Sequence, residues 1–139
     1  MDQSIIFFLS AIIIVGALMC SIICLRGKGK KTLNVEYYRT KCLENEHKLI
    51  KDEVSSYHLS VLNADKLVDQ ALRDLGIKGQ TMGERMKNSV TLFSDRNGIW
   101  TAHKLRNTIA HESDARVTYE DAKYALSCFR QALKDLGAI

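Results

Sequence analysis

One arginine and one histidine have the types and the spacing to do chemistry together in this chain. Arg106, Asn107 and His111 lie in the stretch AHKLRNTIAHE, with four residues between the arginine and the histidine. A histidine side chain with a pKa of about 6.5 can donate or accept a proton near neutral pH. An arginine stays charged, and its planar guanidinium binds phosphoryl oxygens. Together these residue types predict acid–base chemistry at a phosphate group, with Asn107 orienting His111 or the phosphate by hydrogen bonds and no metal or other cofactor implied.

The same stretch resembles the R-x4-6-H signature of the HEPN superfamily, whose members are small all-α domains and in many cases metal-independent endoribonucleases. The resemblance extends over residues 94–139, which are similar to the last two helices of such a domain, and it is strongest to small membrane-anchored bacterial members. It implies cleavage of RNA by attack of a 2′-OH on the adjacent phosphorus. His111 would be the general acid or base, and Arg106 would neutralise the phosphoryl oxygens.

The spacing of Arg106 and His111 limits how their side chains can come together in one site. Five residues on a straight helix correspond to a rotation of about 500°, so the two side chains differ in direction by roughly 140°. Arg106 and His111 therefore converge only if the helix ends or distorts before His111, or if two chains meet. The family resemblance implies the second arrangement, in which two motifs face each other across a two-fold axis. We therefore expect a homodimer with RNA as a candidate partner.

A second interpretation of the motif stays open, namely a non-catalytic, membrane-anchored interaction or scaffold module. In that case Arg106 pairs with Glu112 or Asp114, and His111 caps its helix. The charge distribution is compatible with this second interpretation, because residues 32–139 carry 16 basic and 15 acidic side chains. A general nucleic-acid binder has a broader basic footprint. The sequence names neither an RNA substrate nor a protein partner.

The residues that must position the motif predict an all-α fold. The chain contains no proline, and apolar residues do not alternate with polar ones over strand-like lengths. Spacings of three and four instead predict an antiparallel four-helix bundle over residues 54–139, and the resemblance implies that this bundle is HEPN-like. Its helices are expected at about 54–75, 82–93, 96–110 and 118–136.

Local signals predict where these helices begin and end. Thr81 and Thr118 each precede an acidic residue by three positions, which is typical of a capping box, and Asp95 is expected to cap the third helix. Two nearly identical segments, QALRDLG and QALKDLG, place Gly76 and Gly137 where a left-handed residue ends a helix.

Three further side chains lie close to the predicted bundle or its site. His58 and Asp65 are seven residues apart beside the apolar stripe of the first bundle helix, so both are candidates to face the motif. Ordinary flanking polar positions are the alternative. Trp100 is expected to pack in the core or an interface, because an aromatic residue at helical spacing more often packs than binds a base.

The N-terminal part predicts a membrane anchor. Residues 1–4 form a short extracytoplasmic end, and residues 5–25 are almost wholly apolar. Twenty-one residues span roughly 31 Å as a helix, which matches a bilayer core of about 30 Å. A basic collar at 26–32 follows, so the C-terminal domain is expected in the cytoplasm of a single-pass membrane protein. Residues 33–53 are polar and are expected to form a helical stalk.

Overall fold

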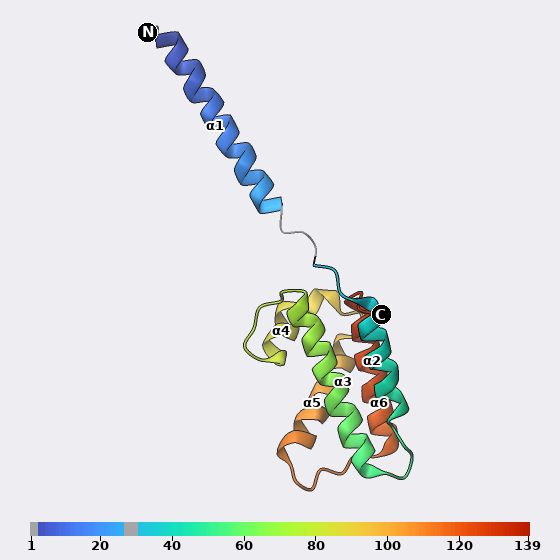
Figure 1. Cartoon of the computed structure of the whole chain (residues 1–139). Coiled ribbons are helices and arrows are strands. Elements are labelled where there is room, and N and C mark those ends of the chain that lie inside the picture. Colours follow the sequence, from blue (N-terminus) through green and yellow to red (C-terminus); the bar gives the residue numbers. More distant parts are fainter. Residues whose placement is uncertain (1–2, 27–30) are drawn as a thin grey trace. The chain divides into compact units, whose positions relative to one another are not determined.

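The computed structural model describes residues 3–26 and 31–139, and these residues form helices without any strand. Two compact units divide the chain, Met1–Lys31 and Thr32–Ile139. The first unit contains α1, and the second contains all the other helices (Figure 1). The elements are α1 (Gln3–Arg26), α2 (Val35–His47), α3 (Val54–Asp74), α4 (Met82–Asn88), the short 3-10 helix η1 (Val90–Leu92), α5 (Arg96–His111) and α6 (Tyr119–Asp135). The all-α prediction is confirmed.

Helix α1 has the length and composition that a bilayer requires. Its segment Gln3–Ile23 is long and apolar enough to cross a membrane, and the side chains of that segment are exposed in the isolated chain. Water hydrates a row of exposed apolar side chains unfavourably. The expected basic collar at 26–32 lies largely outside the described residues, as does the beginning of the expected end at 1–4.

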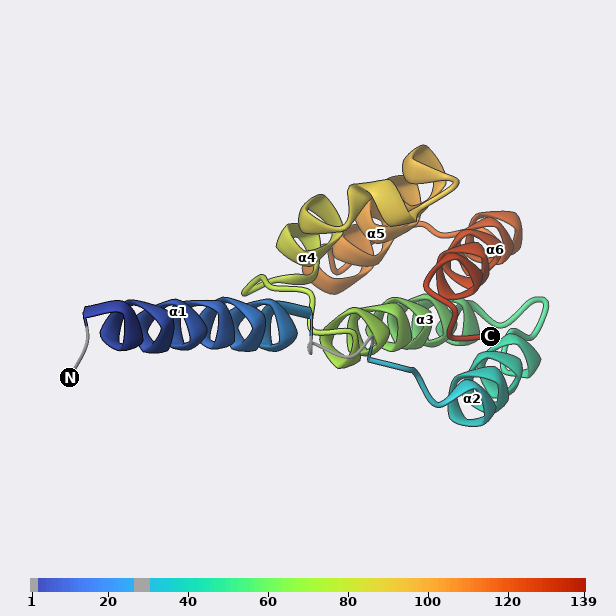
Figure 2. The ribbon, with the colours of Figure 1, turned by 90° about the horizontal axis from the view of Figure 1, so that it is seen from above.

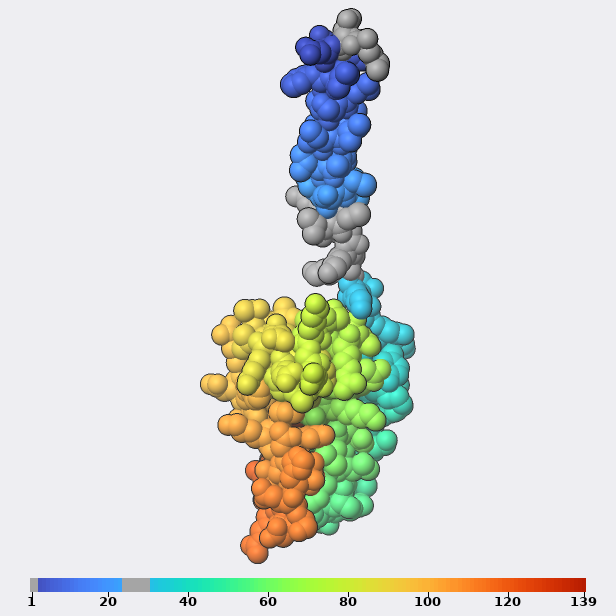
Figure 3. All heavy atoms as spheres, turned by 90° about the vertical axis from the view of Figure 1, so that its left-hand side faces the viewer, coloured from blue at the N-terminus to red at the C-terminus, as the bar shows by residue number. Residues whose placement is uncertain are grey.

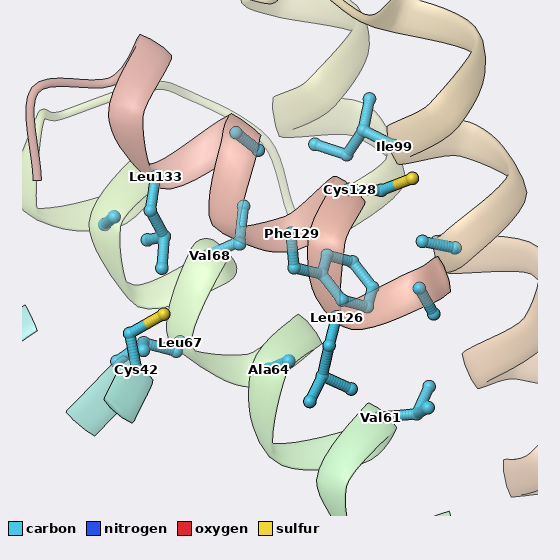
Figure 4. Packing of buried hydrophobic residues seen from close by; sticks show 14 of the residues in the cluster. Cys42, Val61, Ala64, Leu67, Val68, Ile99, Leu126, Cys128, Phe129 and Leu133 are labelled. Atoms are coloured by element: carbon cyan, nitrogen blue, oxygen red, sulfur yellow. The ribbon is translucent and has the colours of Figure 1, made fainter. Parts of the chain in front are cut away.

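The core of the second unit lies where α3, α5 and α6 meet. Val61 and Val68 of α3 face Leu126 and Phe129 of α6, and Ile99 of α5 packs beside them (Figure 4). All five side chains are buried. Complete burial of such a side chain stabilises the fold by about 1.5–3 kcal/mol, which makes this cluster the main source of stability. Seen from above, α6 lies beside both α3 and α5 (Figure 2).

The prediction that residues 33–53 form a separate polar stalk is wrong, because the helix that forms there, α2, is part of the folded second unit. Helix α2 packs against α3 and α6 (Figure 2). It buries Tyr38, Cys42 and Asn45, which share one face at spacings of four and three. The Tyr38 hydroxyl donates a hydrogen bond to Asp74 of α3. Burial, together with that carboxylate, raises the pKa of the Tyr38 phenol above its ordinary value.

The predicted helix starts are confirmed, and one predicted helix is shorter than expected. The side chain of Thr118 accepts a hydrogen bond from the Asp121 amide and forms a full capping box, while Asp95 accepts one from the Gly98 amide. Thr81 accepts from the Glu84 amide and begins α4, but the capping box predicted there is incomplete, because the Glu84 carboxylate accepts from the Gln80 amide instead of the Thr81 amide. The helix expected at 82–93 ends at Asn88, however, and a 3-10 turn replaces its second half.

The repeated heptapeptides end α3 and α6 in the same way. Gly76 has φ 77° and Gly137 has φ 70°, both in the left-handed region. After α3, the amide of Ile77 donates to the carbonyl oxygen of Leu72, at 3.0 Å. The equivalent bond after α6 runs from Ala138 to Leu133 at 2.8 Å. This is the Schellman arrangement, which satisfies carbonyl groups that a helix end otherwise leaves free.

Candidate active site

A groove of about 760 Å³ runs between α3, α4 and α5 in the second unit. Figure 3 looks onto this side of the unit, with α3 in green, α4 in yellow-green and α5 in yellow to orange. Four polar side chains of α5 line the groove: His103, Arg106, Asn107 and His111. The structure therefore brings the three residues predicted from the sequence to one groove of a single chain. It adds a second histidine that the prediction did not include.

His103 is held by a carboxylate from another helix. Its Nδ1 atom lies 2.7 Å from Oδ1 of Asp65, on α3. The side chains of His103 and Asp65 are only 11% and 5% exposed, so water competes little for this contact. An ionised carboxylate only accepts hydrogen bonds, so the proton of a neutral His103 ring is on Nδ1. That tautomer leaves the lone pair on Nε2 available for proton transfer.

Arg106 lies on the other oxygen of the same carboxylate. Its Nε atom is 3.3 Å from Oδ2 of Asp65, an ion-pair distance without hydrogen-bond geometry. Its Nη1 atom donates to Oδ1 of Asn107 at 2.9 Å, so Asn107 orients the arginine. The side chain remains 35% exposed, toward the groove that it lines. The pairing of Arg106 with Glu112 or Asp114, which the alternative interpretation expected, is therefore not the one in the structure.

His111 is the last residue of α5, and it is exposed. The cap position belongs to Glu112, whose amide donates to the carbonyl oxygen of Thr108, so His111 is not the cap of its helix. Within 31–139 the structure gives the His111 side chain no hydrogen bond and no ion pair. Helix α5 continues to His111, yet both motif side chains border the groove. One chain therefore places both motif side chains on the lining of the same groove.

A second carboxylate of α3, the half-buried Asp69, also lines the groove. Asp69 of α3 accepts hydrogen bonds from Arg85 of α4, with Nε at 2.7 Å from Oδ1. Arg73 reaches the other oxygen of Asp69, also at 2.7 Å. The Arg85 side chain is 5% exposed and also donates to the carbonyl oxygen of Gly79. Arg85 therefore fixes α4 and the preceding loop onto α3, and so forms the wall opposite α5.

The charge of the groove favours an anionic ligand. Its lining contains four Lys or Arg side chains, Lys66, Arg73, Arg85 and Arg106, against the carboxylates of Asp65 and Asp69. The excess of positive charge is local, since the whole of residues 32–139 is close to neutral. Low-dielectric walls concentrate the field of such a cluster, which raises the local concentration of anions.

Of the two polar residues proposed on the first bundle helix, only Asp65 lies at the site. His58 does not line the groove, and its Nε2 atom is buried without a hydrogen-bond partner among the described residues. Trp100 packs against the core, as expected, and its ring meets the ring of His103 edge-on at 6.1 Å between centroids. His103 lies three residues before Arg106 and four before Asn107, a helical spacing that signals a shared face and could have identified it.

No family model matches the sequence, and no match was found among curated proteins or solved structures. The resemblance to HEPN domains therefore depends on the motif and on the residues that surround it. In the described part of the chain, no group of three or more His, Cys, Asp or Glu side chains is placed to hold a metal ion. The groove is a cationic site lined by two imidazoles and by the half-buried guanidinium of Arg106.

Proposed function

We propose that this groove is a metal-independent endoribonuclease site in a HEPN-like domain. The observation that carries the proposal is that Arg106, Asn107 and His111 line one groove together with a second imidazole, His103. A guanidinium and imidazoles are the side chains that phosphodiester cleavage needs when no metal supplies the charge. The local excess of cations suits a polyanionic substrate.

The reaction has a simple balance of bonds and protons. The 2′-oxygen of one nucleotide attacks the adjacent phosphorus, and the bond from phosphorus to the 5′-oxygen of the next nucleotide breaks. The products are a 2′,3′-cyclic phosphate end and a 5′-hydroxyl end. One group takes the 2′-OH proton and another gives a proton to the departing oxygen. Arg106 stabilises the charge that gathers on the phosphoryl oxygens, and His111 is one of the proton-transfer groups.

The apolar helix α1 supports a membrane-anchored protein. We propose that the helices of the second unit form a HEPN-like antiparallel bundle, and that α1 spans the membrane once. Positive residues after the apolar segment and Asp2 before it favour a cytoplasmic location for the second unit. Cytoplasmic RNA would then be within reach. Self-association of two chains, expected from the family resemblance, remains a prediction that chemical crosslinking of the membrane-embedded protein would test.

The proposal is tested by incubating the full chain in detergent with mixed single-stranded RNA in the presence of a chelator. We expect cleavage that leaves 2′,3′-cyclic phosphate ends. Arg106→Ala and His111→Ala should each lower the rate by roughly 10²–10⁴-fold, the range that a positioned acid–base group contributes. The matched control is His47→Ala, which removes an exposed histidine of α2 that does not line the groove.

The same experiment decides between the two interpretations of the motif. If the wild-type protein binds RNA or a protein through the groove but cuts no RNA, the non-catalytic interaction module becomes the better description. If Arg106→Ala and His111→Ala lose helical content together with activity, the motif is an element of the fold and the enzymatic proposal loses its support.

A further inference from the structure

We infer that His103, oriented by Asp65, is the general base of this reaction, so that one chain carries both proton-transfer groups. The inference rests on the proposed function and adds a residue to it. The motif by itself contains a single histidine, whereas the reaction needs one group that removes a proton and one that donates a proton. A second imidazole in the same groove completes that pair without a second chain.

The environment of His103 is that of a positioned side chain. The Asp65 carboxylate binds Nδ1 at 2.7 Å, and the ring of Trp100 packs edge-on against the imidazole. Gly83 of α4 lies beside both rings, since a Cβ atom there would be 3.9 Å from His103 Nε2 and 3.9 Å from the Trp100 ring. Glycine leaves space above that nitrogen. His103 lines the groove, and its side chain keeps 11% of its surface exposed.

The contact with Asp65 favours the role of base over that of acid. When Nε2 accepts a proton, the ring becomes an imidazolium, and the buried carboxylate stabilises that charge and keeps the ring oriented. The other charged or titratable groups that line the groove are Lys66, Asp69 and Arg73 from α3, Arg85 from α4, and Arg106 and His111 from α5. Asp69 is bound by Arg85, whereas Asp65 contacts the His103 ring directly, so Asp65 is the carboxylate that acts on His103.

His111 is then the group that donates a proton to the departing 5′-oxygen. Eight residues separate it from His103, which places the two Cα atoms about 12 Å apart along α5. Side chains on a helix tilt toward its N-terminus, so the ring of His111 leans back toward Asn107 and the groove. Arg106, between the two histidines in sequence, would bind the phosphate.

The test uses the full chain in detergent and two substrates of the same sequence. One substrate is ordinary RNA, and the other carries sulfur in place of the bridging 5′-oxygen at the scissile phosphate. A thiolate departs without a proton, so the second substrate needs a base but no acid. We expect His103→Gln to slow cleavage of both substrates by roughly 10²–10⁴-fold. His111→Gln should slow cleavage of the ordinary substrate by a similar factor. The same variant should cleave the sulfur substrate at nearly the wild-type rate.

Co-expression of the two variants tests whether the pair lies within one chain. A mixture of His103→Gln and His111→Gln chains should remain inactive, because each chain lacks one of its two groups. Recovery of a substantial fraction of wild-type activity in mixed oligomers would show that the groups come from different chains, and it would overturn the single-chain part of the inference.

Because His103 and Asp65 are buried, a third variant keeps the inference testable if their substitution unfolds the protein. Gly83→Leu places a side chain over His103 Nε2 on a helix that already exists, and it should lower the rate at least tenfold with unchanged helical content. Lys87→Leu, on the exposed side of α4, is the matched control. If the wild type, Gly83→Leu and His103→Gln all cleave RNA at rates within threefold of one another, His103 takes no part in the reaction and the proposed function stands. Absence of cleavage by the wild type would instead remove the proposed function.

Discussion

The side-chain amide of Asn45 donates a hydrogen bond to the main-chain carbonyl oxygen of Ser60, at 2.7 Å. This contact joins α2 to α3, and both residues are buried. The Ser60 hydroxyl donates to the main-chain carbonyl oxygen of Asn45, at 3.5 Å, so each helix donates a hydrogen bond to the other. An asparagine in a polar segment thus fixes α2 onto the unit that contains the groove.

We expect Asn45→Ala to lower the free energy of unfolding by about 1–3 kcal/mol, because it removes a buried hydrogen bond and leaves a gap between α2 and α3. Urea titration followed by circular dichroism measures the change. Thr40→Ala, on the exposed side of α2, is the control and should change stability little. Equal stability of the wild type and Asn45→Ala would mean that α2 does not contribute to the folded unit.

Leu126→Asp should prevent folding of the second unit. Leu126 is 6% exposed in the core between α3 and α6, and an unpaired carboxylate there loses its hydration. The cost, about 4 kcal/mol or more, approaches the whole stability of a domain of this size. Tyr124→Asp, two residues earlier on α6 and 53% exposed, should retain the wild-type helical spectrum. A Leu126→Asp protein with a cooperative, wild-type melting curve would contradict the packing described here.

Thr118→Ala should lower the free energy of unfolding by about 0.5–2 kcal/mol, because it removes the cap of α6.

The Asp121 carboxylate accepts hydrogen bonds from the Thr118 side chain and from the Thr118 amide. These bonds, the side-chain bond first, hold the pKa of Asp121 below its ordinary value. A carboxylate whose pKa is lower in the folded state stabilises the fold above its unfolded pKa and loses that contribution as the pH falls. The stability difference between the wild type and Asp121→Asn should therefore be full at pH 7 and shrink below about pH 4. A difference that grows toward acidic pH would exclude this assignment.

Gly137→Ala should destabilise the protein by roughly 1–2 kcal/mol, because an alanine at φ 70° is strained. No atom lies within 4 Å of the added Cβ, so the cost comes from the backbone alone. Gly83→Ala, in the regular part of α4, meets only ordinary contacts and should be neutral or stabilising. Thermal unfolding of the two variants compares them directly, and equal melting temperatures would argue against a left-handed end for α6.

The topology is testable in cells. A reporter that is active only outside the cytoplasm, fused after Ile139, is expected to be inactive, since positive residues follow the apolar segment of α1. A reporter that is active only inside should be active at the same position and should sediment with membranes. The opposite pair of results would place the second unit outside the cytoplasm.

Much of the fold was predictable because its signals are local. The apolar stripes of α3 and α6 recur at spacings of three and four, and their bounds agree with the prediction within about two residues. The caps Asp95 and Thr118 act on amides three residues away, so short stretches of sequence contain the whole interaction. Helix α2 was misassigned as a stalk, because its buried face consists of a tyrosine, a cysteine and an asparagine, which do not form a recognisable apolar stripe.

The residues of the site also fall into those that a local pattern predicts and those that depend on tertiary packing. The sequence by itself determined Arg106, Asn107 and His111 as a motif near the end of a helix, since their spacing is a property of one segment. Only the tertiary structure decided that Asp65 meets His103, which lies 38 residues further along the chain, and that Arg106 lies against the same carboxylate. Such a pair depends on how α3 and α5 pack against each other, and a shift by one residue along either helix would turn a side chain by about 100° away from its partner. That packing is set by the buried apolar residues of α3, α5 and α6 together, which no single segment of the sequence contains.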